Sequence, residues 1–101
     1  MKRICVFCGS AVGSRPVYAD SARQFGTLLA SRGLDLVYGG GHIGLMGVLA
    51  DSALAAGGYV IGVIPQSMVE REMAHSGATQ MHVVETMHQR KALMVKLSDS
   101  R

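Results

Sequence analysis

No hydrophobic run in the 101-residue sequence approaches the length of about 20 residues that a membrane-spanning helix needs. The apolar stretch near the start is also short and runs into glycine, so it lacks the core of a signal peptide. Hydrophobic residues make up 49% of the chain and charged residues 17%, which is the composition of an ordinary folded domain. We therefore expect a cytoplasmic protein without a membrane partner.

Cysteine is scarce, and basic residues are few and scattered. Cys5 and Cys8 fall in a predicted strand, where residues three apart point to opposite faces, so neither a disulfide scaffold nor a redox CxxC is expected. The formal charge is only +3, which disfavours a nucleic-acid partner. The four histidines show neither HExxH nor a paired spacing with cysteine, so we expect no metal and no other cofactor.

The most informative segment runs from residue 37 to 47, where an apolar stretch ends in Gly39, Gly40 and Gly41 and a helical pattern resumes at once. Glycine accepts positive φ and lets a bound group approach the backbone, so the pattern predicts a tight strand-to-helix turn with outward amides. Such amides at a helix N-terminus can hold a phosphate without a cationic side chain. The alternative is a tight turn with close helix packing and no ligand.

Strands and helices alternate along the chain at the spacing typical of a parallel sheet. The patterns predict strands at 2–7, 34–38, 59–64 and, more weakly, 81–84, with helices at about 14–32, 45–56 and 86–97 and a short helix near 69–73. We expect one Rossmann-like α/β domain over residues 1–101, with flanking helices and a parallel sheet. Ligands of such folds bind beyond the carboxyl ends of the strands.

Two helices carry local signals. The first has Tyr18, Ala22, Phe25 and Leu29 at spacings of four, three and four, which predicts one buried stripe. The last begins with a capping-box pattern, Thr86 to Gln89, and reaches the end of the sequence without another strand. Because a half-built sheet has an open edge and a small core, we expect a truncated domain, the alternative being a helix that packs on a partner subunit.

The spacing Gly39-x-Gly41-x-x-Gly44 formally matches the dinucleotide fingerprint. The next strand ends without an acidic residue for the ribose, however, and the glycines follow the second strand rather than the first. No Gly-Lys-Ser/Thr follows them either, which excludes a P-loop. The sequence therefore disfavours NAD, FAD and a P-loop nucleotide site.

Arg90 and Lys91 lie within about a turn of the start of the last helix, at the predicted ligand edge. Two cations and a helix dipole there could hold a phosphate or a phosphorylated sugar, the alternative being a solvated basic face. Glu72 lies in the loop after the third strand, where it could accept hydrogen bonds from a ribose or a base. A carboxylate of this kind is more often a surface residue.

Together, four separated segments closely resemble the LOG ("lonely guy") family, long described as lysine decarboxylases; they are residues 5–10 (CVFCGS), 38–47 (YGGGHIGLMG), 60–65 (VIGVIP) and 87–91 (MHQRK). The resemblance covers essentially the whole chain. It implies a metal-independent, typically homodimeric Rossmann-like subunit that hydrolyses the N-glycosidic bond of a nucleoside 5′-monophosphate, AMP or N6-isopentenyl-AMP. The products would be the free base, a cytokinin, and ribose 5-phosphate.

The same resemblance implies that Arg90 is catalytic, that Lys91 joins it in binding substrate and that Glu72 contacts the nucleotide. Ser10 and Gly41, at the ends of the first two strands, complete the predicted substrate-binding set. Ribosyl cleavage builds positive charge on the sugar, which a carboxylate can stabilise. The family's PGGxGTxxE segment, which binds phosphate and supplies the catalytic glutamate, is absent from residues 1–101. We therefore expect these residues alone to be inactive or nearly so.

Two other classes of function stay open. A nucleotide-binding module without catalysis could use the same sheet edge to carry or sense a phosphorylated ligand. A purely structural fragment could dimerise through residues 87–97. Ligand-induced stabilisation separates these two, because only a nucleotide-binding protein gains stability from a nucleotide.

Overall fold

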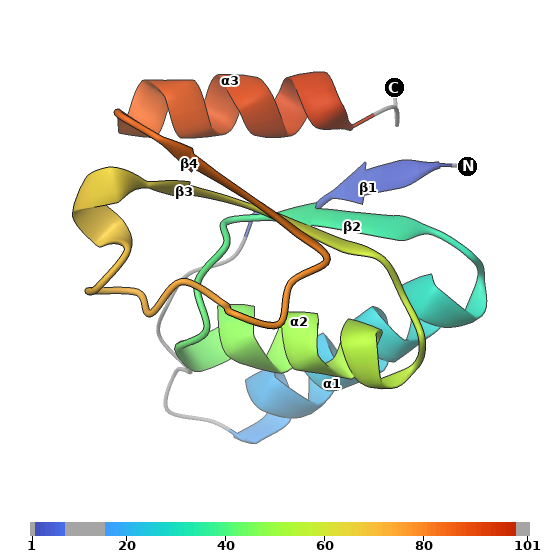
Figure 1. Cartoon of the computed structure of the whole chain (residues 1–101). Helices are drawn as coiled ribbons and strands as arrows, with labels where there is room; N and C mark the ends of the chain where they lie inside the picture. The colour runs from blue at the N-terminus through green and yellow to red at the C-terminus, as the bar shows by residue number, and fades with distance from the viewer. Residues whose placement is uncertain (1, 8–15, 99–101) are drawn as a thin grey trace.

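The computed structural model describes residues 2–7 and 16–98, which form a parallel sheet with helices on both faces (Figure 1). The elements follow in the order β1 (Arg3–Cys5), α1 (Pro16–Ser31), β2 (Asp35–Tyr38), α2 (Gly44–Ala55), β3 (Val60–Pro65), the 3₁₀ helix η1 (Gln66–Met68), β4 (Gln80–Val84) and α3 (Met87–Leu97). The strand order is β1-β2-β3-β4, and each neighbouring pair is parallel. The predicted α/β class is confirmed. Within the described ranges, no helix is long and apolar enough to cross a membrane.

The sheet separates two apolar clusters because successive strand residues point to opposite faces. In Figure 1, α1 and α2 lie on one face of the sheet and α3 lies on the other. The first cluster joins the sheet to α1 and α2, and its buried members are Leu29, Leu36, Tyr38, Met46, Leu49, Ala50, Ala53 and Val60. The second joins the sheet to α3 through Val37, Ile61, Val63 and Met94. Alternation along β2 and β3 thus supplies both halves of the core.

The predicted buried stripe of α1 was partly wrong. Tyr18 is 47% exposed and Phe25 is 39% exposed, whereas Leu29 is buried. The reason is Gly26, where an added Cβ would lie 2.6 Å from the Leu49 carbonyl oxygen of α2. Because Gly26 has no side chain, α1 approaches α2 closely along Ala22, Gly26 and Leu29, and the two aromatic rings lie to the side of that contact.

The short helix expected near 69–73 was also wrong, since the helical turn is η1 and residues 69–73 form turns. Met73 has φ +52°, which stops any helix there. Ala74 then pairs with Gly41 in an isolated antiparallel bridge. The first strand is also shorter than predicted, and the other strand bounds agree within one residue.

The start of α3 confirms the capping box. The Gln89 amide donates to Thr86 Oγ1 at 3.0 Å, and the Thr86 amide donates to Gln89 Oε1 at 3.3 Å. At the other end of the helix, Ser98 Oγ donates to the Arg3 carbonyl oxygen at 3.2 Å. Helix α3 therefore begins near the carboxyl end of β4 and ends beside β1, so its first turn lies at the edge where the sequence predicts a ligand.

Candidate active site at the carboxyl edge of the sheet

Arg90, in the first turn of α3, reaches across the carboxyl ends of two strands. Its Nε donates to the Val63 carbonyl oxygen of β3 at 3.0 Å, and its Nη2 donates to the carbonyl oxygen of Gly39, directly after β2. The same Nη2 donates to Glu72 Oε1 at 2.7 Å. The structure thus brings together two of the predicted site residues, which are separated by 18 positions in the sequence.

This ion pair is shielded from water, because the Arg90 side chain is 11% exposed and that of Glu72 is 14% exposed. A shielded charge needs its partner, and removing one member leaves the other unpaired. The remaining guanidinium nitrogen, Nη1, lies 3.8 Å from Met87 Sδ, which is a weak acceptor. Nη1 is therefore the guanidinium nitrogen best able to donate to a ligand.

The backbone of the glycine turn after β2 packs directly against this pair. Gly40 has φ +82°. A Cβ added at Gly39 would lie 2.7 Å from Arg90 Nη2, and one at Gly41 would lie 2.9 Å from the Glu72 carbonyl oxygen. The close-packing interpretation of the glycines therefore has a physical basis here. The additional phosphate-binding role remains a prediction.

The backbone amides of the turn are only partly available. The His42 amide donates to the Glu72 carbonyl oxygen at 2.9 Å, so the protein itself satisfies that group. Helix α2 begins at Gly44, and the side chain of its N-cap residue, Ile43, makes no capping hydrogen bond. The first amides of α2 are thus the backbone donors best placed for an anion.

The other predicted site residues lie in different surroundings. Lys91 is exposed and makes no hydrogen bond or ion pair with the described part of the chain. Gly41 is buried beside the Glu72 backbone. Ser10 and Cys8 lie outside the described residues. Cys5 is partly buried, and burial raises the pKa of its thiol, which disfavours a reactive thiolate.

A shallow hollow opens at the carboxyl ends of β3 and β4. Its volume is about 520 Å³, and it is lined by Gln66, Ser67, Val83, Val84 and Glu85. Val83 is 51% exposed there. Two valines with polar groups around them could contact a planar base, and Glu85 continues directly into the first turn of α3.

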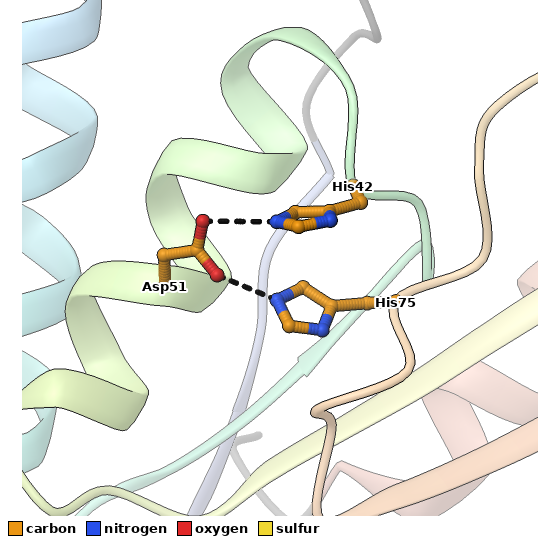
Figure 2. Close-up of side chains that lie close together, drawn as sticks. All are labelled: His42, Asp51 and His75. Carbon is orange, nitrogen blue, oxygen red and sulfur yellow. Dashed lines mark hydrogen bonds and ion pairs between the residues drawn. The ribbon is translucent and has the colours of Figure 1, made fainter.

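One cluster of titratable side chains was missed by the sequence patterns. His42, Asp51 and His75 meet beside α2 (Figure 2) and offer ligand atoms within 4.8 Å of one another, so they could hold a metal ion. Partial burial raises the pKa of the Asp51 carboxyl, but hydrogen bonds and charge interactions with His75 and His42 outweigh this, and the pKa lies below its ordinary value of 3.8. The three positions have no motif spacing, so only the fold brings them together.

Comparison with known proteins gives relatives over nearly the whole chain. A family model described as "Possible lysine decarboxylase" matches residues 46–100. Cytokinin riboside 5′-monophosphate phosphoribohydrolase LOG1 of Arabidopsis thaliana is 50% identical over 99 residues, which are 98% of this chain and 46% of that protein. The probable phosphoribohydrolase LOGL1 of Oryza sativa subsp. japonica is 48% identical, over 97% of this chain and 44% of that protein.

A solved structure has a similar fold over nearly the whole of this chain. The X-ray structure of TM1055 is 25% identical, with a TM-score of 0.72 over 98% of this chain and 58% of that one. The chain thus spans about half the length of the curated relatives it matches.

Proposed function

This chain belongs to the LOG family, and we propose that it forms the nucleotide-binding part of a cytokinin riboside 5′-monophosphate phosphoribohydrolase. The substrate would be AMP or N6-isopentenyl-AMP, and the products the free base and ribose 5-phosphate. The observation that carries the proposal is the shielded ion pair of Arg90 and Glu72, held at the carboxyl ends of β2 and β3.

The chemistry suits these residue types. Water attacks C1′ of the ribose, the bond from C1′ to the base nitrogen breaks, and its electron pair leaves with the base, which gains a proton. Positive charge builds on the sugar as the bond breaks, and a nearby carboxylate stabilises that charge. Glu72 would accept hydrogen bonds from the ribose, and Arg90 would hold both Glu72 and the ligand.

The phosphate needs its own partners. Lys91 is exposed beside Arg90 and is not paired with a described carboxylate, so its ammonium group is free to meet an anion. The first amides of α2 and the positive end of its dipole add a second source of attraction. We place the phosphate between these groups and Gly41, with Ser10 as a further predicted contact.

On this proposal, catalytic turnover needs residues from outside the half of the relatives that this chain matches. Glu72 Oε1 already accepts from Arg90, so this carboxylate is poorly placed to activate water. The other glutamates, Glu70 and Glu85, do not follow a PGG turn. We expect the 101 residues alone to bind nucleotide and to release base several orders of magnitude more slowly than a chain that also has the PGGxGTxxE segment.

The same pairing of Glu72 favours one other function, a nucleotide-binding module without catalysis. The two functions predict the same ligand at the same edge of the sheet. They differ only in whether base is released once a catalytic glutamate is supplied.

We further propose a cytoplasmic homodimer. The support is an apolar surface on α1, where Tyr18, Phe25 and Leu28 are 47%, 39% and 44% exposed. Exposed apolar groups that gather on one helix commonly mark a protein interface. Sedimentation equilibrium of the chain and of a Phe25→Ser variant tests this, since the variant should shift the equilibrium toward monomer.

The test of the proposed reaction uses two proteins. The first is the 101-residue chain, with its intact mass recorded, and the second is residues 1–98 fused to the unmatched C-terminal part of Arabidopsis LOG1. The fusion should release base from AMP or N6-isopentenyl-AMP, and Arg90→Lys should reduce the rate because lysine cannot reproduce the forked contacts of arginine. Arg23→Lys, at an exposed pair on α1, is the matched control. A folded fusion that binds AMP without releasing base would favour the non-catalytic module.

A further inference from the structure

Three side chains from separate segments meet beside α2, apart from the Arg90 and Glu72 pair (Figure 2). Asp51 uses both carboxylate oxygens, since Oδ2 lies 3.0 Å from His42 Nε2 and Oδ1 lies 2.6 Å from His75 Nε2. The two imidazole rings have centroids 4.1 Å apart. One carboxylate of α2 therefore joins the turn after β2 to the loop before β4.

The tautomer of a neutral His75 ring follows from its second partner. The Gly77 amide donates to His75 Nδ1 at 2.9 Å, so Nδ1 acts as an acceptor and carries no proton. A neutral imidazole then has its proton on Nε2, which donates to Asp51 Oδ1. A metal bound through Nε2 would need the tautomer that carries its proton on Nδ1. That proton would point at the Gly77 N–H, so the hydrogen bond between them would be lost. The arrangement therefore favours hydrogen bonds over a metal ion.

The backbones of the same two histidines hold the loop against the glycine turn. The His42 amide donates to the Glu72 carbonyl oxygen and the His75 amide donates to the Gly40 carbonyl oxygen, both at 2.9 Å. The bridge between Gly41 and Ala74 lies between these two bonds. Residues 72–75 thus run along residues 40–42, and Asp51 binds a side chain from each of these segments.

The loop needs such support at Met73. This residue has φ +52°, in the left-handed region that non-glycine residues adopt only when their surroundings hold them there. Its side chain contributes little, because Met73 is 56% exposed. The bonds on either side, at Glu72 and His75, must therefore keep the reversal in place.

We propose that Asp51 is a positioning residue for the nucleotide site. Through His75 and His42 it holds residues 72–75 against the glycine turn, and this places the Glu72 carboxylate beside Arg90. The effect on nucleotide affinity rests on the proposed function, whereas the placement of Glu72 does not.

The first test needs no ligand and uses the folded chain. Asp51→Asn keeps the size of the side chain but leaves one acceptor oxygen for two ring N–H donors. In NMR spectra the variant should move the Arg90 Nε–H resonance and the amides of residues 72–75, and the ring ¹⁵N shifts should show that His75 no longer keeps its single tautomer. The matched control is Asp20→Asn. Asp20 also lies on a helix and has nearly the same exposure, 57% against 56% for Asp51, but it pairs with Arg23.

The second test measures AMP affinity by calorimetry. Asp51→Asn should weaken binding by about three- to tenfold, the effect of one lost hydrogen bond, and Asp20→Asn should not. If Asp51 acts through Glu72, the double variant Asp51→Asn/Glu72→Gln binds no more weakly than Glu72→Gln alone. Additive losses would overturn the proposal.

The two tests fail in different ways. A wild-type chain that ignores AMP would contradict the proposed function, and the NMR comparison would still decide the role of Asp51. Unchanged Arg90 and loop resonances in Asp51→Asn would overturn the positioning role. So would tight binding of Zn²⁺ to the wild type that transfers the His75 proton to Nδ1, because the cluster would then be a metal centre.

Discussion

The glycine turn is held by two sets of residues that differ in their exposure to water. Arg90 and Glu72 form a pair with side chains 11% and 14% exposed, and two backbone carbonyls hold the arginine. In the cluster beside α2 only the His75 side chain is buried, at 6% exposure, while that of Asp51 is 56% exposed. A shielded charge is costly to leave unpaired, whereas a half-exposed one is screened. The first set therefore controls stability, and the second adjusts the position of residues 72–75.

The largest effect should follow from breaking the shielded pair. Arg90→Ala leaves the Glu72 carboxylate without its cation, and we expect a loss of about 3–5 kcal/mol in the free energy of unfolding. Urea denaturation measures it. The comparison variant, Arg23→Ala, removes an exposed pair on α1 and should cost under about 1 kcal/mol.

Because Arg90→Ala could fail to fold, a paired replacement keeps the comparison testable. Arg90→Met/Glu72→Gln removes both charges and should recover most of the lost stability. If the double variant is as unstable as Arg90→Ala, the loss comes from packing of the arginine and not from an unpaired carboxylate.

A smaller effect should come from the turn that both sets share. In Gly41→Ala the new Cβ would lie 2.9 Å from the Glu72 carbonyl oxygen, a backbone atom that moves only with its loop. We expect a loss of about 1–3 kcal/mol on urea denaturation. In Gly39→Ala the nearest atom, at 2.7 Å, is Arg90 Nη2, which donates to Glu72 and to the Gly39 carbonyl oxygen. Gly39→Ala should therefore cost more than Gly41→Ala, because it displaces the shielded pair, and a smaller cost would show that Arg90 can shift without losing Glu72.

The smallest effect should be the pH dependence contributed by Asp51. The pKa of its carboxyl is lowered in the folded chain, so its stabilisation is present above the ordinary value of 3.8 and is lost as the pH falls through the folded pKa. Among the described residues, the charged or titratable groups facing it are His42, His75 and, across the hollow between α1 and α2, Arg23.

The difference in unfolding free energy between wild type and Asp51→Asn measures this contribution. We expect it to be under about 1 kcal/mol at neutral pH, because the carboxyl is half-exposed, and to shrink below about pH 4. A difference that grows on acidification would contradict the sign of the shift.

Local patterns predicted the parts of the fold that depend on neighbours in sequence. The apolar strands β2 and β3, the glycine turn and the capping box at Thr86 each need only a few adjacent residues, and all three are present. The buried face of α1 was misjudged because Gly26 has no side chain to enter a hydrophobic pattern, yet its contact with Leu49 sets the helix orientation.

The sequence could predict which residues belong to the candidate site, but not which of them contact each other. The family resemblance pointed to Arg90, Glu72 and Lys91 individually, while the bond between Arg90 and Glu72 depends on the reversal at Met73. The cluster of His42, Asp51 and His75 gave no signal, since its members are 9 and 24 positions apart and come from three segments.

The central claim is that a nucleotide binds where Arg90 meets the ends of β2 and β3, and an NMR titration of the chain with AMP tests it directly. We expect AMP to shift the Arg90 Nε–H, the Lys91 amide and the first amides of α2, and to leave the Arg23 side chain unchanged. No shifts at any AMP concentration, or shifts confined to the hollow lined by Arg23, Thr27 and Ser52, would contradict the account.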